Sequence, residues 1–215
     1  AEPIRAVPTP PPPGFWAEVR RACDATGTLL IFDEIPTGLG RTAKLFASEW
    51  AGVDPDVVVL GKALGGGILP LAAVLAKPEL DVMADKAIGH YTHEKNPVLA
   101  AAGLATLDVI AEEGLVERAE RLGARALDRL RAMRHPAIGE VRGVGLLLGV
   151  DLSLPDGSPA IDLADRVLHA ALTRGLSFKV TMGSVLTLAP PLTISEADLD
   201  LGLDILDAAF ADAAD

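Results

Sequence analysis

The sequence is poor in the residues that disulfide-rich, membrane-spanning and nucleic-acid-binding proteins need. One cysteine, Cys23, stands among 215 residues, which excludes an internal disulfide framework and fits a reducing compartment. No apolar run reaches the roughly 20 residues of a spanning helix. Lys and Arg number 19 against 30 Asp and Glu, and the net charge of −11 disfavours phosphate backbones and anionic lipid. With no signal-peptide pattern, we expect a cytoplasmic protein that binds neither nucleic acid nor a membrane.

What the chain has in quantity is apolar residues, at 50% of the total. That share excludes disorder of the whole chain and supplies a sizeable core. At roughly 150 residues per domain, the length corresponds to one domain and a part of another, or to two small domains.

Three short apolar runs in the first half predict buried strands, namely LLIFDE at 29–34, VVVLGK at 57–62 and LAAVLA at 71–76. Helical spacing predicts helices over 15–26, 97–111 and 113–134, and the second of these is apolar enough to be buried on most sides. Strands and helices in this order predict an α/β domain that ends near residue 135.

After residue 135 the sequence changes to glycine-punctuated strands and two helices. We expect one strand over 140–152, a helix over 160–174, and short strands within 176–183 and 185–192. Ser195 and Asp198 resemble a capping box, so the last helix begins there. The pattern predicts a small α+β domain over 136–215.

Two of the predicted strands end in an ionisable residue, Asp33 and Lys62. If these strands are parallel neighbours, both side chains project into one crevice at the carboxyl edge of the sheet. A desolvated lysine can attack an aldehyde, and an aspartate can keep a pyridine nitrogen protonated, so the pair suits pyridoxal phosphate chemistry. From spacing alone, a solvated strand end and a turn residue are the commoner interpretation of these two residues.

Two further patterns are weaker. Residues 38–43 read GLGRTA and match the dinucleotide fingerprint GxGxxA, but four residues separate them from Asp33, where the strand ends. An oxidoreductase built on this loop is therefore a minor alternative. His90 and His93 have HxxH spacing without a clear third ligand, so we expect no metal site.

The run from 29 to 76 resembles the class III aminotransferases, which are pyridoxal-phosphate enzymes of fold type I. It joins DE-x-x-x-G-x-GRT, a GVxPD step and GKALGGG in the family's order. The segments THEKNP (92–97), VRGVGLLLGV (141–150) and LAPPLTI (188–194) are also similar to family segments. The resemblance implies the C-terminal part of a fold type I large domain over 1–135, followed by the small α+β domain over 136–215.

The resemblance also implies roles for three residues. Lys62 would form the Schiff base with pyridoxal 5′-phosphate and move the proton, and Asp33 would pair with the pyridine nitrogen. Thr92 would bind the cofactor phosphate from across a homodimer interface. The implied reaction moves an amino group between an amine or amino acid and an oxo acid.

The sequence departs from the family at three points. Family members are roughly twice as long, so we expect the C-terminal half of such a protein, with exposed apolar sheet edges and weak cofactor binding by itself. Pro36 stands where many relatives have Gln, and Thr187 stands where many have the Arg that grips a carboxylate. Some lyases of the family that act on phosphorylated or phosphonate amines also lack that Arg, so elimination of ammonia or phosphate is the alternative reaction.

Overall fold

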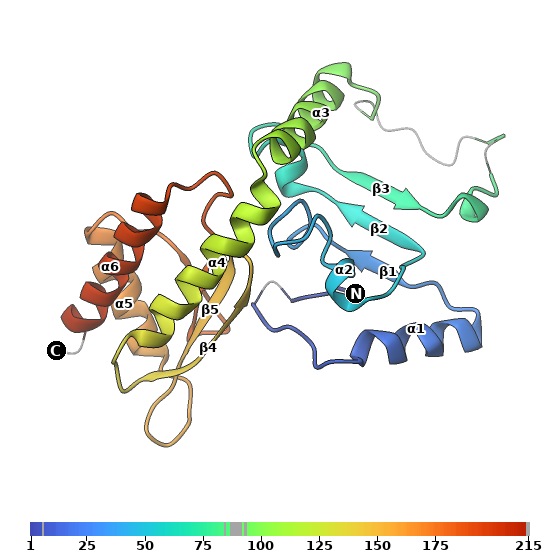
Figure 1. Cartoon of the computed structure of the whole chain (residues 1–215). Coiled ribbons are helices and arrows are strands. Elements are labelled where there is room, and N and C mark those ends of the chain that lie inside the picture. The colour runs from blue at the N-terminus through green and yellow to red at the C-terminus, as the bar shows by residue number, and fades with distance from the viewer. Residues whose placement is uncertain (6, 84, 87–91, 93, 214–215) are drawn as a thin grey trace. The chain divides into compact units, whose positions relative to one another are not determined.

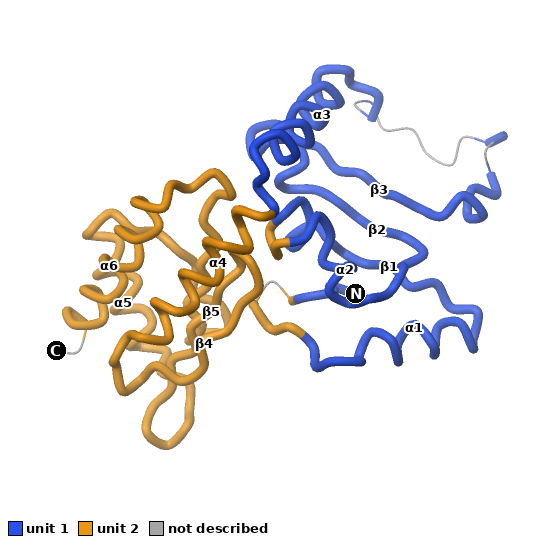
Figure 2. The backbone as a smooth tube through the Cα atoms, viewed as in Figure 1, with its two compact units in different colours: residues 1–4, 11–40, 44–116 blue, residues 5–10, 41–43, 117–215 orange. Residues whose placement is uncertain are grey.

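The computed structural model describes residues 1–5, 7–83, 85–86, 92 and 94–213 (Figure 1). The chain divides into two compact units (Figure 2). Unit 1 consists of Ala1–Ile4, Pro11–Gly40 and Lys44–Val116, and unit 2 consists of Arg5–Pro10, Arg41–Ala43 and Glu117–Asp215. No helix in the described part of the chain is long and apolar enough to cross a membrane.

Unit 1 is built on a mixed three-stranded sheet in the order β1-β2-β3. Its strands are β1 (Ile31–Asp33), β2 (Val57–Leu60) and β3 (Ala73–Ala76). β1 and β2 are parallel, with Asp33 opposite Val59, and β3 is antiparallel to β2. The three strands confirm the apolar runs, and each is shorter than its run.

Five helices are described in unit 1: α1 (Phe15–Thr26), α2 (Ser48–Ala51), the 3₁₀ turns η1 (Lys62–Gly65) and η2 (Pro78–Leu80), and α3 (Pro97–Glu112). Gly27 ends α1 in the left-handed conformation, as the sequence predicts. Trp16 of α1 packs edge-to-face on Phe32 of β1, with ring centroids 4.7 Å apart, and its indole N–H donates to the Pro3 carbonyl. This contact fixes α1 against the sheet.

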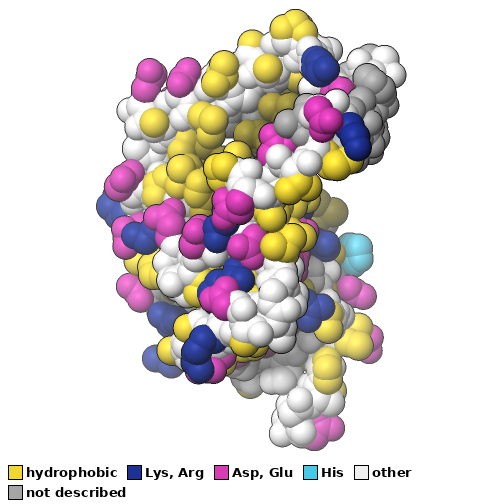
Figure 3. Space-filling view, turned by 90° about the vertical axis from the view of Figure 1, so that its right-hand side faces the viewer, with side chains coloured by type: hydrophobic (Ala, Val, Ile, Leu, Met, Phe, Trp, Pro, Cys, Tyr) yellow, Lys and Arg dark blue, Asp and Glu magenta, His cyan; other side chains and the backbone are white. Residues whose placement is uncertain are grey.

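The expectation that the helix after Pro97 is buried on most sides is wrong for this chain. In α3 only Gly103 and Ile110 are buried, while Val98 and Leu104 are each 64% exposed. β3 presents Val74 and Leu75 to solvent in the same way. Figure 3 shows apolar side chains gathered at the height where Figure 1 draws these elements. The apolar sequence of α3 predicts a helix that is covered on most sides. No described element of this chain covers its exposed residues.

Unit 2 contains a four-stranded antiparallel sheet in the order β4-β5-β7-β6. The strands are β4 (Ile138–Val144), β5 (Leu147–Leu152), β6 (Lys179–Thr181) and β7 (Val185–Leu188), and the helices are α4 (Leu115–Ala132), α5 (Ile161–Thr173) and α6 (Glu196–Asp212). The single strand expected over 140–152 is a hairpin. Gly145, at a φ of 57°, turns the chain between β4 and β5.

One large core holds unit 2 together. It joins the apolar stripe of α4, including Leu122 and Leu130, to Leu148 and Leu186 of the sheet and Leu206 of α6. α6 begins as predicted, because the Ser195 hydroxyl accepts from the N–H of Asp198. Both observations give the α+β unit that the sequence predicts.

Along the sequence, the long segments of the two units change over between Val116 and Glu117. The predicted domain boundary lies near residue 135. α4 accounts for the difference, because its stripe packs in the core of unit 2. As a statement about domains, the boundary at 135 stays a prediction.

Candidate active site

Asp33 is the last residue of β1 and is half-buried. Its Oδ1 accepts a hydrogen bond from the N–H of Ile35 at 3.0 Å, which fixes the orientation of the carboxylate. Within the described part of the chain, Oδ2 has no hydrogen-bond partner. One oxygen is therefore available for a protonated ring nitrogen.

Lys62 follows β2 by two residues and begins η1. Its φ of 45° lies in the left-handed region, which side-chain-bearing residues rarely adopt. Such strain costs about 1–3 kcal/mol and persists where the surroundings impose it, often at functional sites. The Lys62 side chain is exposed and its amine makes no ion pair or hydrogen bond with any residue the structure describes. The described residues therefore do not supply the dry surroundings that the predicted chemistry needs.

The sheet brings Asp33 and Lys62 to one edge. β1 and β2 are parallel neighbours, and each of the two residues lies at or just beyond the carboxyl end of its strand. Gly66 and Gly67 follow with φ values of 69° and 76°, and an added Cβ at Gly67 would meet no atom within 4 Å. An acid, an amine and open glycine backbone fit a flat, anionic aldehyde cofactor such as pyridoxal phosphate. The individual roles of the residues stay predictions.

The remaining predicted positions lie in the segment before α3. Thr92 is in a turn and is exposed. His90 and His93 lie outside the described residues, so the HxxH pattern stays untested. Among the residues that are described, no group of three or more His, Cys, Asp or Glu is arranged to hold a metal ion.

The segment 38–43 does not open a helix, as the dinucleotide fingerprint requires, because the next helix begins at Ser48. The structure shows instead that the loop after Asp33 is arranged around Glu34. This side chain is 1% exposed and accepts hydrogen bonds from Thr37, Ala47 and Ser48. Sequence reasoning passed over Glu34; the only signal was a second acid directly after the strand.

A second charged cluster lies at the opposite, amino-terminal end of β2. Asp56 accepts hydrogen bonds from the N–H of Leu30 and from Arg20, both at 2.7 Å, and from Lys77 at 3.0 Å. These donors, the Leu30 N–H first, hold the pKa of the Asp56 carboxyl well below its usual range. The cluster joins α1, β2 and the end of β3, so its role is structural.

In unit 2, Thr187 lies on β7 opposite Lys179 of β6. The Thr187 hydroxyl is 2.8 Å from the Thr181 hydroxyl and is buried. The position where many relatives have a carboxylate-binding Arg therefore holds a pair of neutral hydroxyls beside one lysine.

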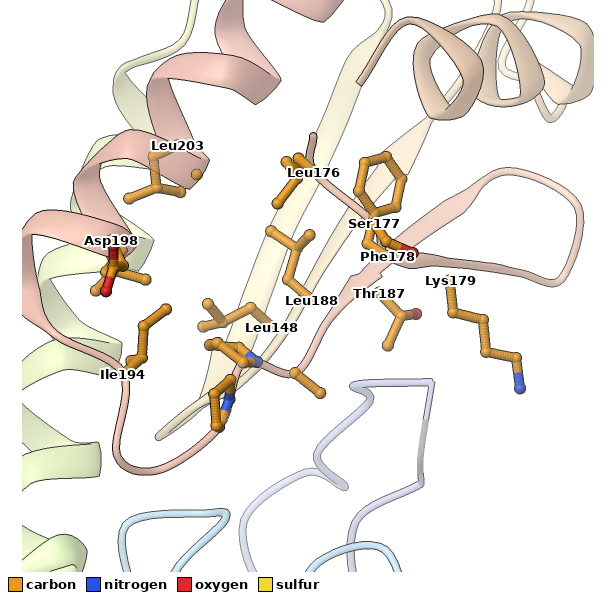
Figure 4. Close-up of a pocket in the computed structure, with 15 residues that line it drawn as sticks. Leu148, Leu176, Ser177, Phe178, Lys179, Thr187, Leu188, Ile194, Asp198 and Leu203 are labelled. Atoms are coloured by element: carbon orange, nitrogen blue, oxygen red, sulfur yellow. The ribbon is translucent and has the colours of Figure 1, made fainter. Parts of the chain in front are cut away.

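Unit 2 also contains a cavity of about 440 Å³ between β7 and α6. Figure 4 shows Leu148, Leu176 and Leu188 facing Ile194 and Leu203 across it, while the Lys179 side chain extends away. Its lining is mainly apolar and includes neither Asp33 nor Lys62. The cavity is therefore not the predicted catalytic site.

Comparison with known proteins agrees with this arrangement. The family model of the class III aminotransferases matches residues 5–210, and the chain belongs to that family. Members of the family are pyridoxal-phosphate-dependent enzymes.

The similar proteins include enzymes of two kinds. The (R)-1-hydroxy-2-aminoethylphosphonate ammonia-lyase of Vibrio splendidus is 40% identical over 94% of this chain and 43% of the lyase. Ornithine aminotransferase 2 of Staphylococcus aureus is 44% identical over 90% of this chain and 47% of that enzyme. A solved ornithine aminotransferase of Toxoplasma gondii, described with partial occupancy of the cofactor at its active site, has a TM-score of 0.90 and 34% identity over 100% of this chain and 50% of its own. The chain thus spans about half the length of these relatives.

Proposed function

We propose that the protein is a pyridoxal-phosphate-dependent aminotransferase that moves an amino group between an amine or amino acid and an oxo acid. The observation that carries the proposal is the placement of Asp33 and Lys62 at the carboxyl ends of two paired parallel strands, with Lys62 in a strained backbone conformation. Pyridoxal phosphate, when bound, supplies an electrophilic carbon and a ring that withdraws electrons from the substrate.

Lys62 and Asp33 have separate roles in this proposal. The Lys62 amine would hold the cofactor covalently and, once the substrate amine has displaced it, would accept the proton that leaves the substrate α-carbon. Oδ2 of Asp33 would accept a hydrogen bond from the ring nitrogen and so keep it protonated. Lys62 is exposed, and this chain covers about half the length of its relatives. Both observations support the proposal that the residues which shield the relatives' lysine from water belong to the part of their sequence that this chain does not match.

Thr92 is proposed to bind the cofactor phosphate in a partner subunit of a homodimer. Its exposed position in a turn supports this role. If it does so, Thr92→Ala lowers the affinity for the cofactor and not the affinity for a cofactor-free partner subunit.

The test of the site is chemical trapping. The protein is incubated with pyridoxal phosphate and reduced with borohydride, and the modified peptide is identified by mass spectrometry. We expect the label on Lys62 and its loss in Lys62→Ala. Asp33→Asn should still be labelled but should transfer amino groups about a hundredfold more slowly. Labelling elsewhere, or turnover by Lys62→Ala, would overturn the assignment.

A lyase that releases ammonia or phosphate is the second candidate. Thr187, in place of a carboxylate-binding Arg, favours it, as does the similarity to the aminoethylphosphonate ammonia-lyase. The two reactions differ in one requirement. Turnover that needs an added oxo acid supports the aminotransferase, and sustained release of ammonia or phosphate without one supports the lyase.

A further inference from the structure

Glu34 is a buried acid beside the candidate site that the proposed chemistry does not use. Its Oε2 accepts from the Thr37 hydroxyl at 2.7 Å and from the N–H of Ala47 at 2.9 Å, and its Oε1 accepts from the N–H of Ser48 at 2.8 Å. All three partners are donors, so the carboxylate acts only as an acceptor. Burying a carboxylate is unfavourable unless such bonds satisfy it, and here they tie both ends of the loop 37–48 to one side chain.

The main chain of Glu34 is tied to the sheet at the same point. Its N–H donates to the carbonyl of Val59 at 2.9 Å, and its carbonyl accepts from the N–H of Gly38 at 2.9 Å. The turn 34–38 is therefore fastened to the carboxyl end of β2 as well as to its own loop.

The turn and the end of β2 are in close contact. A Cβ added to Gly38 would lie 3.0 Å from the Glu34 carbonyl and 3.3 Å from the Leu60 side chain. A Cβ added to Gly61 would lie 3.5 Å from Ile35. The next residue is Lys62, whose left-handed backbone persists only while its surroundings hold it.

We propose that Glu34 is a positioning residue that holds Asp33 and Lys62 in their reactive arrangement. Its carboxylate fixes the loop, the turn 34–38 packs on Leu60 and Gly61, and this contact holds the backbone of Lys62. The proposal rests on the proposed function, because it assumes that Asp33 and Lys62 act on one cofactor.

The first measurement is amide hydrogen exchange of the cofactor-free protein. Glu34→Gln removes one acceptor and presents an NH₂ group to donors. It should raise exchange about tenfold or more in the loop 35–48 and also in the peptide covering 59–66. A role confined to the loop would raise exchange in 35–48 alone, and this outcome overturns the proposal.

The second measurement is borohydride trapping of pyridoxal phosphate on Lys62. Occupancy at limiting cofactor should fall about tenfold in Glu34→Gln. The matched control is Glu49→Gln, which makes the same charge change in α2, directly after the loop, at an exposed residue whose carboxylate accepts from the N–H of Phe46. This control should leave trapping unchanged.

The outcomes separate the two proposals. No trapping on Lys62 in the unmutated protein, even at saturating cofactor, would contradict the proposed function. Normal trapping in the unmutated protein and equal trapping in Glu34→Gln would contradict only the role of Glu34. If Glu34→Gln fails to fold, Thr37→Val decides, because it removes one donor and leaves the carboxylate. A smaller rise of exchange at 59–66 supports the proposal, and no rise overturns it.

Discussion

The two compact units differ in how completely each buries its own apolar residues. Unit 2 has one continuous core that includes residues from three helices and from the two central strands of its sheet. Unit 1 has a small buried cluster around Trp16 and Phe32, and most of the large exposed apolar side chains of the described residues belong to it.

The predicted chemistry lies entirely in unit 1, the unit with the less complete core. Asp33, Glu34 and Lys62 are positioned by short strands and loops rather than by a closed core. The relatives are about twice as long as this chain. Unit 2 therefore buries most of its large apolar side chains within itself, whereas unit 1 leaves many of its described ones exposed to solvent. Four predictions test this difference, in order of expected effect.

The largest effect compares two strand leucines. Leu148→Ala in β5 removes a side chain that is 1% exposed, and should lower the free energy of unfolding by about 3–4 kcal/mol. Leu75→Ala in β3 removes one that is 48% exposed, and should change it by less than about 0.5 kcal/mol. Urea unfolding followed by circular dichroism measures both, and tryptophan fluorescence follows unit 1, where both tryptophans lie. Equal losses would remove the distinction between the units.

Helix glycines give the second comparison. A Cβ at Gly123 of α4 would lie 2.1 Å from the Gly145 carbonyl, so Gly123→Ala should destabilise unit 2 by about 3 kcal/mol. A Cβ at Gly103 of α3 would meet the end of the Leu71 side chain, which can move, so Gly103→Ala should cost less than about 1 kcal/mol. Gly202→Ala in α6, with ordinary contact at 3.6 Å, serves as the control and should be neutral or stabilising. Melting temperatures of the three variants rank them.

The third prediction concerns acid and unit 1. The folded state lowers the pKa of Asp56, so the stability it contributes is complete above about pH 5 and is lost as the pH falls through the unfolded value toward the folded one. Asp56→Asn should cost about 2 kcal/mol at pH 7 and should flatten the loss of stability between about pH 5 and pH 3. Melting curves followed by tryptophan fluorescence at each pH measure this. An unchanged acid slope in Asp56→Asn would contradict it.

The smallest effect is expected at the surface of unit 2. Three arginines at four-residue intervals on α4 pair with three acids at the same interval on α6, namely Arg121 with Glu196, Arg125 with Asp200 and Arg129 with Asp204. Because these pairs are exposed, Arg125→Gln should lower the melting temperature only slightly at low salt and not measurably at about 1 M NaCl. A loss of stability that persists in high salt would mean that these three ion pairs contribute more than the attraction of surface charges.

The sequence was sufficient for features that depend on local pattern. The strands before Asp33 and Lys62, the helix that Gly27 ends and the cap at Ser195 are all in place. Each depends on residues within a few positions of one another. The family resemblance added the fold, because the motifs around Asp33 and Lys62 are specific.

The features that the sequence did not reveal depend on distant partners. Gly145 reads as one more glycine in a strand until the pairing of β4 with β5 shows a hairpin. Glu34 reads as a polar loop residue until Ala47 and Ser48, more than ten positions away, close on its carboxylate. The prediction that α3 is buried was wrong for the same reason. An apolar sequence does not show whether the residues that would cover it lie in the same chain.

The left-handed backbone conformation of Lys62 lowers the stability of the folded protein, while the side chain at that position carries the amine of the proposed reaction. Glycine adopts that conformation freely, so Lys62→Gly should give a protein without the amine that melts at a higher temperature than the original. Selection for stability alone would then remove the proposed reactive residue, and a screen for thermostable variants would enrich proteins that lack its amine. A stabilised form of this protein must therefore be checked for Lys62 before a higher melting temperature is taken as an improvement.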